Sequence, residues 1–224
     1  MKRRPVITID GPAGAGKSTA ARELARRLGF KLLDTGALYR ALAWAVREAG
    51  VPPSDEAGVR GVVERTSVDL QDERVLVNGR EVSAEIRSPE LGMLTSALTT
   101  LQAVRDKLTP LQRRLAAAGG VVLEGRDTGS VVCPDAEVKF YLDAVLEERA
   151  RRRHEELVAK GVPADYESVK ADIARRDRQD MERRLAPLVT SEGAVVLDST
   201  ALSAHEVVER MLDTVEQARC CTRS

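Results

Sequence analysis

The sequence predicts an α/β protein with a parallel sheet, and two observations lead to this prediction. Short apolar runs rich in Val and Ile alternate along the chain with segments of helical spacing, which is the pattern of parallel strands joined by crossover helices. The first run, residues 6–9, passes through a glycine-rich turn into a helix that begins at Lys17. We expect further strands at residues 121–123, 138–142 and 195–197, and further helices that begin near residues 37, 103, 146, 167 and 203.

The composition narrows the range of partners. The chain has 224 residues, and its 35 Lys and Arg are balanced by 35 Asp and Glu. Without a basic field, we expect no nucleic acid and no membrane as partner. The apolar run after the basic start MKRRPVITID is too short for a signal peptide, and the three cysteines form no CxxC pair. We therefore expect a cytoplasmic protein that acts on small molecules.

Two regions depart from the alternating pattern. Residues 67–82, SVDLQDERVLVNGREV, contain two β-like runs and the dipeptide Asn78-Gly79, which is the strongest short signal for a hairpin. This region predicts an antiparallel insertion. Residues 147–161, EERARRRHEELVAKG, predict a very polar helix with little apolar face, exposed to solvent.

The segment between the first strand and helix has the composition of a phosphate-binding loop. Its sequence GPAGAGKS matches G-x-x-x-x-G-K-[ST] at every fixed position and lies between a strand and a helix, as that motif requires. Glycines let successive N–H groups point into one cavity, and the helix adds the positive end of its dipole. We expect Lys17 to reach the β- and γ-phosphates of a nucleoside triphosphate and Ser18 to bind Mg²⁺. A turn that only connects strand and helix is the alternative.

The rest of the sequence indicates which class of nucleotide-binding protein this is. Asn78 is the only asparagine and Gly79 follows it, so the Asn-Lys-x-Asp segment by which GTPases recognise guanine is absent. Several arginines lie in segments suited to a second phosphate, which Arg binds bidentately, although a solvated surface charge is the alternative for each. These arginines are Arg40, Arg126, Arg152, Arg153, Arg176 and Arg183.

A phosphorylated acceptor would remove the need for a general base. The second pKa of a phosphate monoester is about 6, so the acceptor is largely a dianion at neutral pH. An alcohol acceptor would need a positioned carboxylate or histidine. The two histidines, His154 and His205, lie in polar or terminal helical segments, and we expect neither to be a buried base.

Five motifs together resemble those of the bacterial cytidylate kinases (CMP kinases) of the nucleoside monophosphate (NMP) kinase superfamily. They are GPAGAGKST, LLDTGALYR, EGRDTGSVVCPDA, RRDRQDMERRLAPL and VVLDST, and the resemblance covers nearly the whole chain. Thr35 stands where the family commonly has Ser, Ser130 where it commonly has Thr, and Glu124 where Asp also occurs.

The resemblance implies a role for each matching position. The loop residues would bind ATP phosphates and Mg²⁺: Gly11, Pro12, Ala13, Gly14, Ala15, Gly16, Lys17, Ser18 and Thr19. The CMP-binding residues would be Thr35, Arg40 and Arg126 at the phosphate, Ser96, Arg105 and Asp127 at cytosine, Arg176 and Asp180 at the ribose, and Arg183 toward the transferred phosphoryl group. The implied catalytic residues are Lys17, Arg126 and Arg183, and the lid candidates are Arg152 and Arg153.

Spacing supports part of this assignment independently. Arg176, Asp180 and Arg183 are spaced i, i+4 and i+7, which places them on one face of a helix. An ordinary salt-bridge ladder within the helix is the alternative. Tyr39 has two open roles, near the nucleotide or in the core.

We therefore expect a doubly wound P-loop kinase with an antiparallel β-containing NMP-binding insertion and a short helical lid. The expected core is 1–62, 97–146 and 166–224, the insertion is 63–96 and the lid is 147–165. The expected reaction transfers a phosphoryl group from ATP to CMP or dCMP with Mg²⁺, in a monomer whose lid excludes water. Another small-molecule kinase, of the UMP or shikimate type, and an ATP-dependent interaction module are the alternatives. A second phosphate site favours an enzyme over the module.

Overall fold

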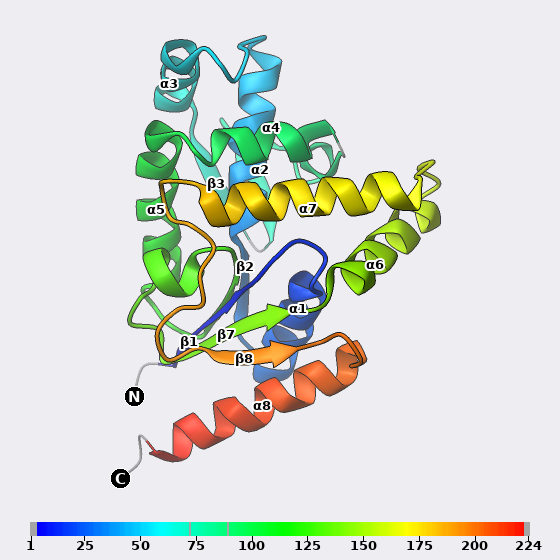
Figure 1. Ribbon diagram of the computed structural model, residues 1–224. Coiled ribbons are helices and arrows are strands. Elements are labelled where there is room, and N and C mark those ends of the chain that lie inside the picture. The colour runs from blue at the N-terminus through cyan, green and yellow to red at the C-terminus, as the bar shows by residue number, and fades with distance from the viewer. Residues whose placement is uncertain (1–3, 72, 89, 222–224) are drawn as a thin grey trace. The chain divides into compact units, whose positions relative to one another are not determined.

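The computed structural model describes residues 4–71, 73–88 and 90–221, which form two compact units (Figure 1). The first unit comprises Met1–Leu32 and Gly119–Ser224, and the second comprises Leu33–Ala118. The second unit is thus longer than the predicted insertion at 63–96, and the functional division of the chain stays a prediction. Within the described residues, no helix is both long and apolar enough to cross a membrane.

The first unit is built on a five-stranded sheet in the order β2-β6-β1-β7-β8. Its strands are β1 (Val6–Asp10), β2 (Lys31–Asp34), β6 (Val121–Gly125), β7 (Val138–Asp143) and β8 (Val195–Asp198), and the boundary between the units falls in β2. β1 pairs in parallel with β6 and β7, and β7 with β8. β1 and β6 are buried along their whole length, as central parallel strands are. The predicted α/β class is confirmed.

Two helices of the first unit pack on the sheet and on each other. They are α1 (Lys17–Leu28) and α8 (Ala204–Cys221). α1 ends at Gly29, whose φ of +63° lets its N–H bond back to the last turn. The apolar core between helices and sheet includes Ile7, Ile9, Leu24, Phe140 and Met211.

Two further helices pack side by side after β7, α6 (Leu146–Ala159) and α7 (Tyr166–Glu182) (Figure 1). As we expected, α6 has little apolar face and most of its residues are exposed or half-buried, but the helix does not lie wholly in solvent. Ala150 is fully buried and packs in a small cluster with Ala13 of the loop and with Val169 and Ile173 of α7. The periodic apolar positions are few, but α7 and the loop cover them.

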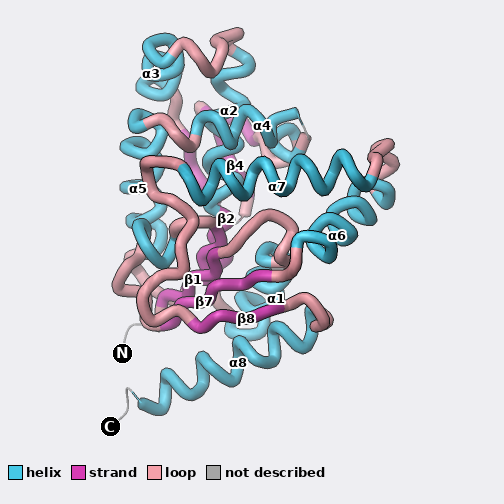
Figure 2. The backbone as a smooth tube through the Cα atoms, viewed as in Figure 1, coloured by secondary structure: helices cyan, strands magenta, loops and turns pink. Residues whose placement is uncertain are grey.

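The second unit surrounds a small antiparallel sheet with helices (Figure 2). Its elements are α2 (Thr35–Glu48), α3 (Glu56–Arg65), β3 (Val68–Gln71), β4 (Arg74–Val77), β5 (Arg80–Glu81), the short 3₁₀-helix η1 (Glu85–Arg87), α4 (Glu90–Leu98) and α5 (Gln102–Ala116). Asn78 and Gly79 join β4 to β5 with φ of +49° and +80°, as a two-residue hairpin loop requires. The predicted hairpin is confirmed.

Among the strands and α-helices of the described residues, the sequence analysis did not predict β2, α3 and α4. β2 has four residues, and α3 and α4 carry glycines at Gly58, Gly61 and Gly92 that weaken the helical signal. The predicted helix starts agree with the structure to within about two residues, the usual uncertainty of a helix end. α2 starts at Thr35 because the Asp34 side chain accepts the N–H of Ala37 at 2.9 Å as its N-cap.

Candidate active site

The phosphate-binding loop connects β1 to α1 and needs glycine at two positions in particular. A Cβ on Gly11 would lie 2.0 Å from the carbonyl oxygen of Leu142 in β7, so only glycine passes this close to the neighbouring strand. Gly16, the N-cap of α1, has a φ of +91° in the left-handed region. α1 then begins at Lys17, which puts the positive end of its dipole at the loop.

Lys17 is a buried cation in a strongly perturbing environment. Its exposed fraction is 6%, and its Nζ donates to the carbonyl oxygen of Pro12 at 2.6 Å. Burial, followed by the charge of Arg126, lowers the pKa of Lys17 to about 7, although Glu124 and Asp10 oppose the shift. A bound phosphate would favour the charged form, because an anion offsets the loss of hydration. Such a residue at the start of a phosphate-binding helix is suited to neutralise phosphate charge.

Ser18 and Glu124 supply the oxygen atoms that a divalent ion prefers. Ser18 Oγ donates to Glu124 Oε2 at 2.9 Å, which joins the first turn of α1 to the end of β6. Mg²⁺ is usually held by one or two protein oxygens together with substrate phosphates and water. No cluster of three or more His, Cys, Asp or Glu in the described part of the chain could hold a metal ion. The two oxygen atoms of Ser18 and Glu124 fit a metal shared with a triphosphate.

Asp10 is a functional candidate that the sequence analysis missed. Its Oδ1 accepts the N–H of Thr128 at 2.9 Å and the hydroxyl of the same residue at 2.8 Å, and its Oδ2 accepts the N–H of Gly129 at 2.7 Å. Burial raises the pKa of Asp10, and these hydrogen bonds oppose the shift. Asp10 thus holds the segment that follows Arg126 and Asp127. An acidic residue at the end of a fully buried strand was the available signal.

A cluster of opposite charges joins the end of β6 to the end of α7. Arg126 Nε donates to Asp180 Oδ2 at 2.9 Å. Arg183 pairs with the other oxygen of Asp180 at 3.4 Å and with Asp127 Oδ1 at 3.6 Å, and its Nε donates to the Ala186 carbonyl oxygen at 2.7 Å. The structure therefore brings together four of the predicted site residues. Their pairing orients both guanidinium groups.

The predicted helical face is correct for Arg176 and Asp180, which both lie in α7, but not for Arg183. α7 ends at Glu182, and Arg183 is its C-cap with an extended backbone. The pairing of Asp180 with Arg126 also extends beyond the helix. The arrangement is therefore more than a salt-bridge ladder within one helix.

In the second unit, Thr35 and Arg40 lie on the first turns of α2. Thr35 is the first residue of the helix and is buried. Arg40 Nη2 donates to Asp34 Oδ2 at 3.1 Å, so the residue that caps the helix also orients this guanidinium group. A Cβ on Gly36 would lie 3.2 Å from the Asp34 carboxylate, so glycine leaves room for this arrangement.

Ser96 and Arg105 lie in the same unit, on α4 and α5. Arg105 Nε donates to the Thr99 carbonyl oxygen at 2.7 Å, and its Nη1 lies 3.5 Å from the Tyr39 hydroxyl. The guanidinium carbon is 5.8 Å from the centre of the Tyr39 ring, which is a cation–π distance. Tyr39 therefore positions Arg105. Both Ser96 and Arg105 are buried.

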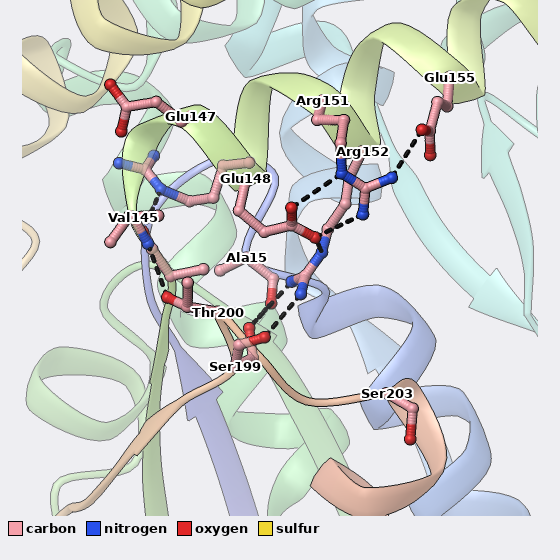
Figure 3. A network of polar contacts seen from close by, with 12 residues as sticks. Ala15, Val145, Glu147, Glu148, Arg151, Arg152, Glu155, Ser199, Thr200 and Ser203 are labelled. Carbon is pink, nitrogen blue, oxygen red and sulfur yellow. Dashed lines mark hydrogen bonds and ion pairs between the residues drawn. The ribbon is translucent and has the colours of Figure 1, made fainter.

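The two lid candidates on α6 have different surroundings, and Figure 3 shows those of Arg152. Arg152 donates to Glu148 Oε1 at 2.8 Å, to Ser199 Oγ at 2.9 Å and to the Ser199 carbonyl oxygen at 2.6 Å. Arg153 pairs with Glu156 of its own helix at 2.8 Å. Of these two arginines, Arg152 is therefore the one whose contacts connect α6 to the segment after β8.

Ser199 extends this connection to the phosphate-binding loop. Its Oγ donates to the Ala15 carbonyl oxygen at 3.2 Å, next to the Arg152 guanidinium group (Figure 3). A Cβ on Gly16 would lie 3.9 Å from Arg152 Nη1. Ser199 belongs to the quoted motif VVLDST, but the sequence analysis assigned it no role.

Comparison with known proteins identifies the family. The family model described as "Cytidylate kinase" matches residues 7–217. The chain belongs to the cytidylate kinase family. It is 49% identical to a protein named cytidylate kinase from Geobacter sp. (strain M21), over 95% of this chain and 93% of that protein. It is 48% identical to a protein of the same name from Geobacillus kaustophilus (strain HTA426), over 97% of this chain and 99% of that protein.

A solved structure of an uncharacterized protein from Eubacterium ventriosum has a TM-score of 0.52 to this chain at 9% identity, and covers 96% of this chain and 99% of that one. This likeness concerns the fold alone. Membership of the cytidylate kinase family makes the chain an ATP-dependent phosphotransferase that acts on CMP, as the sequence predicts.

Proposed function

We propose that the chain transfers the γ-phosphoryl group of ATP to CMP or dCMP with Mg²⁺ as its metal, and that the predicted site residues carry out this reaction. The observation that carries the proposal is the buried Lys17 with Arg126 close enough to depress its pKa. Two cations at the end of a parallel sheet, beside a phosphate-binding loop, suit a migrating phosphoryl group. Catalysis of this kind consists of positioning and charge neutralisation.

In the first unit, the loop residues from Gly11 to Thr19 bind the triphosphate, and Lys17 neutralises the β- and γ-phosphates. Mg²⁺, held by Ser18 with Glu124 beside it, supplies further charge neutralisation when bound. Arg126 and Arg183 contact the transferred group and the acceptor phosphate, and Asp180 orients both. Arg176 and Asp180 bind the ribose, and Asp127 binds cytosine.

In the second unit, Thr35 and Arg40 bind the phosphate of CMP, and Ser96 and Arg105 bind its base. Asp34 and Tyr39 orient the two arginines. The acceptor phosphate is largely a dianion at neutral pH, so no residue has to remove a proton. The surroundings of the two histidines agree with this, since His154 lies against the Ala164 carbonyl oxygen and His205 is exposed.

We also propose that residues 147–165 form a lid that excludes water, as the contacts of Arg152 with Ser199 support. Lid closure over the nucleotide would suppress ATP hydrolysis. We propose a cytoplasmic location, where thiols stay reduced, because the three cysteines of the sequence form no CxxC pair. We propose that the protein is a monomer and that its partners are ATP and CMP or dCMP. Light scattering of the protein as it elutes from a size-exclusion column would test the monomeric state.

The deciding experiment measures ADP release with ATP and Mg²⁺ against CMP, dCMP, UMP, AMP and shikimate. We expect the highest kcat/KM with CMP and dCMP, and little ADP release without an acceptor. A preference for UMP or shikimate would contradict the proposed acceptor. ATP binding without ADP release in the presence of any acceptor would instead indicate an interaction module.

A further inference from the structure

A buried ion pair between α6 and α7 holds both main-chain polar groups of one residue of the phosphate-binding loop. Asp177 Oδ1 accepts the N–H of Ala13 at 3.1 Å, and Arg149 Nη1 donates to the carbonyl oxygen of the same residue at 3.1 Å. Arg149 and Asp177 also pair directly with each other. Both polar groups of one loop residue are therefore bound by two side chains of opposite charge. We call Arg149 and Asp177 the Ala13 clamp.

The clamp is enclosed by protein. The Arg149 and Asp177 side chains are 9% and 8% exposed. Arg149 Nε also donates to the Ala144 carbonyl oxygen at 2.8 Å, so hydrogen bonds offset part of the cost of burying the guanidinium group. A Cβ on Gly14 would lie 2.9 Å from the backbone oxygen of Arg149, which shows how closely α6 approaches the loop.

The contacts of Ala13 determine which part of the loop is free to bind phosphate. Its N–H is directed to Asp177, and the N–H groups that follow begin at Gly14. Gly14 and Gly16 have φ of +78° and +91°, and glycine has more backbone freedom than any other residue, so the loop needs an external constraint to stay ordered. The clamp supplies that constraint immediately before the phosphate-binding N–H groups.

We propose that Arg149 and Asp177 are positioning residues that orient the loop for the triphosphate of ATP. They act through the main-chain N–H and carbonyl groups of Ala13 and need not contact a substrate. Because the clamp lies on the ATP side of the reaction, its loss weakens ATP binding and leaves CMP binding nearly unchanged. The inference rests on the proposal that the loop binds ATP.

The test is a double variant, Arg149→Met with Asp177→Leu, which removes both hydrogen bonds to Ala13 but keeps the net charge. Buried ion pairs can often be replaced by apolar residues of similar volume without loss of stability, so we expect the variant to fold. The Kd of a non-hydrolysable ATP analogue and the KM for ATP should rise about tenfold or more. The KM for CMP at saturating ATP should change less than about threefold.

The matched control is Arg175→Met with Asp172→Leu. These two residues also form an ion pair, in which Arg175 Nη2 lies 2.9 Å from Asp172 Oδ1. Both lie on α7, and their side chains are exposed. We expect wild-type KM values for both substrates. If the first double variant does not fold, Arg149→Lys is measured instead, because one ammonium group cannot replace the fork that binds Ala13, Ala144 and Asp177 together. Its KM for ATP should rise while its KM for CMP stays constant.

Two results would overturn the inference. One is an unchanged Kd for the ATP analogue in a folded clamp variant. The other is an equal rise of both KM values together with a lower Tm, which indicates a structural role only. If the wild-type protein does not bind the ATP analogue, the proposed function itself is contradicted. This measurement is made before any variant, so the two failures are distinguished.

Discussion

In the first unit, Arg126 and Asp180 are 54 residues apart and Ser18 and Glu124 are 106 residues apart, yet each pair is in hydrogen-bond contact. In the second unit, Arg40 bonds to Asp34 and Arg105 bonds to the Thr99 backbone, each across six residues. The first set of contacts forms only when the whole unit has folded. The second set belongs to single helices and their ends, apart from the contact of Arg105 with Tyr39.

The two arrangements respond differently to a lost side chain. In the first unit one carboxylate, Asp180, serves two arginines, so its removal takes an ionic partner from both Arg126 and Arg183. In the second unit each arginine has its own partner. Residues in one network are expected to couple strongly, and residues with separate partners only weakly.

The largest effect is expected for Lys17→Met. Loss of a cation that acts on the developing charge should lower kcat by at least about 10²- to 10³-fold, while the fold persists. Arg40→Met in the second unit should mainly raise the KM for CMP, because it removes binding of the acceptor. Steady-state kinetics with both substrates measure the difference. Lys31→Met, at an exposed lysine, is the control, and wild-type turnover of Lys17→Met would disprove the assignment of the loop.

A carboxylate-to-amide change in each unit tests the comparison directly. Asp180→Asn should lower kcat/KM for CMP about 10²-fold, because both Arg126 and Arg183 lose a charged partner. Asp34→Asn should lower it less than about tenfold, since Asn still caps α2 and only Arg40 loses its charged partner. The measurement is kcat/KM for CMP in the two variants. Similar losses of kcat/KM in both variants would contradict the contrast between Asp180, which pairs with two arginines, and Asp34, which pairs with Arg40.

Asp127 tests whether the charge cluster also recognises the base. Cytosine presents an amino donor where uracil presents a carbonyl oxygen, and one mismatched base contact costs about 1–3 kcal/mol. Asp127→Asn should therefore lower kcat/KM for CMP and reduce its advantage over UMP. If Asp127 only positions Arg183, with which it pairs, both substrates lose equally. An unchanged CMP-to-UMP ratio would remove Asp127 from base recognition.

The last effect concerns stability and not catalysis. The pKa of Lys17 is about 7 in the folded protein against an ordinary 10.5, so between these values the unfolded chain binds more protons. The free energy of unfolding should therefore increase as the pH rises across this range. Lys17→Met lacks this contribution and should have a higher Tm than wild type near pH 6.5. The two Tm values should converge toward pH 10, and a constant gap would contradict the buried, perturbed lysine.

The sequence predicted the parts of the site whose chemistry is local. The strand, loop and helix around Lys17 and the Asn78-Gly79 hairpin depend on adjacent residues, and the structure has both. Arg149 lies in the same run of charged residues as the exposed Arg151, and nothing local distinguishes the two. The burial of Arg149 follows from Ala150 and from α7, which only the tertiary fold brings to it.

Asp10 illustrates the same limit in the core. Its position at the end of β1 was visible, but its partners Thr128 and Gly129 lie 118 and 119 residues away. β2, α3 and α4 escaped prediction because they are short or contain glycine. Arg183 was placed in a helix because the spacing carried no signal for the end of α7 at Glu182.

The depressed pKa of Lys17 also links nucleotide binding to proton uptake. Near pH 7.5 much of the free enzyme holds this lysine as a neutral amine, and a bound triphosphate favours the ammonium form. The buffer must supply that proton, so the calorimetric heat of ATP binding includes the buffer's own heat of ionisation. Titrations in Pipes and in Tris at one pH should therefore give different enthalpies for the same affinity.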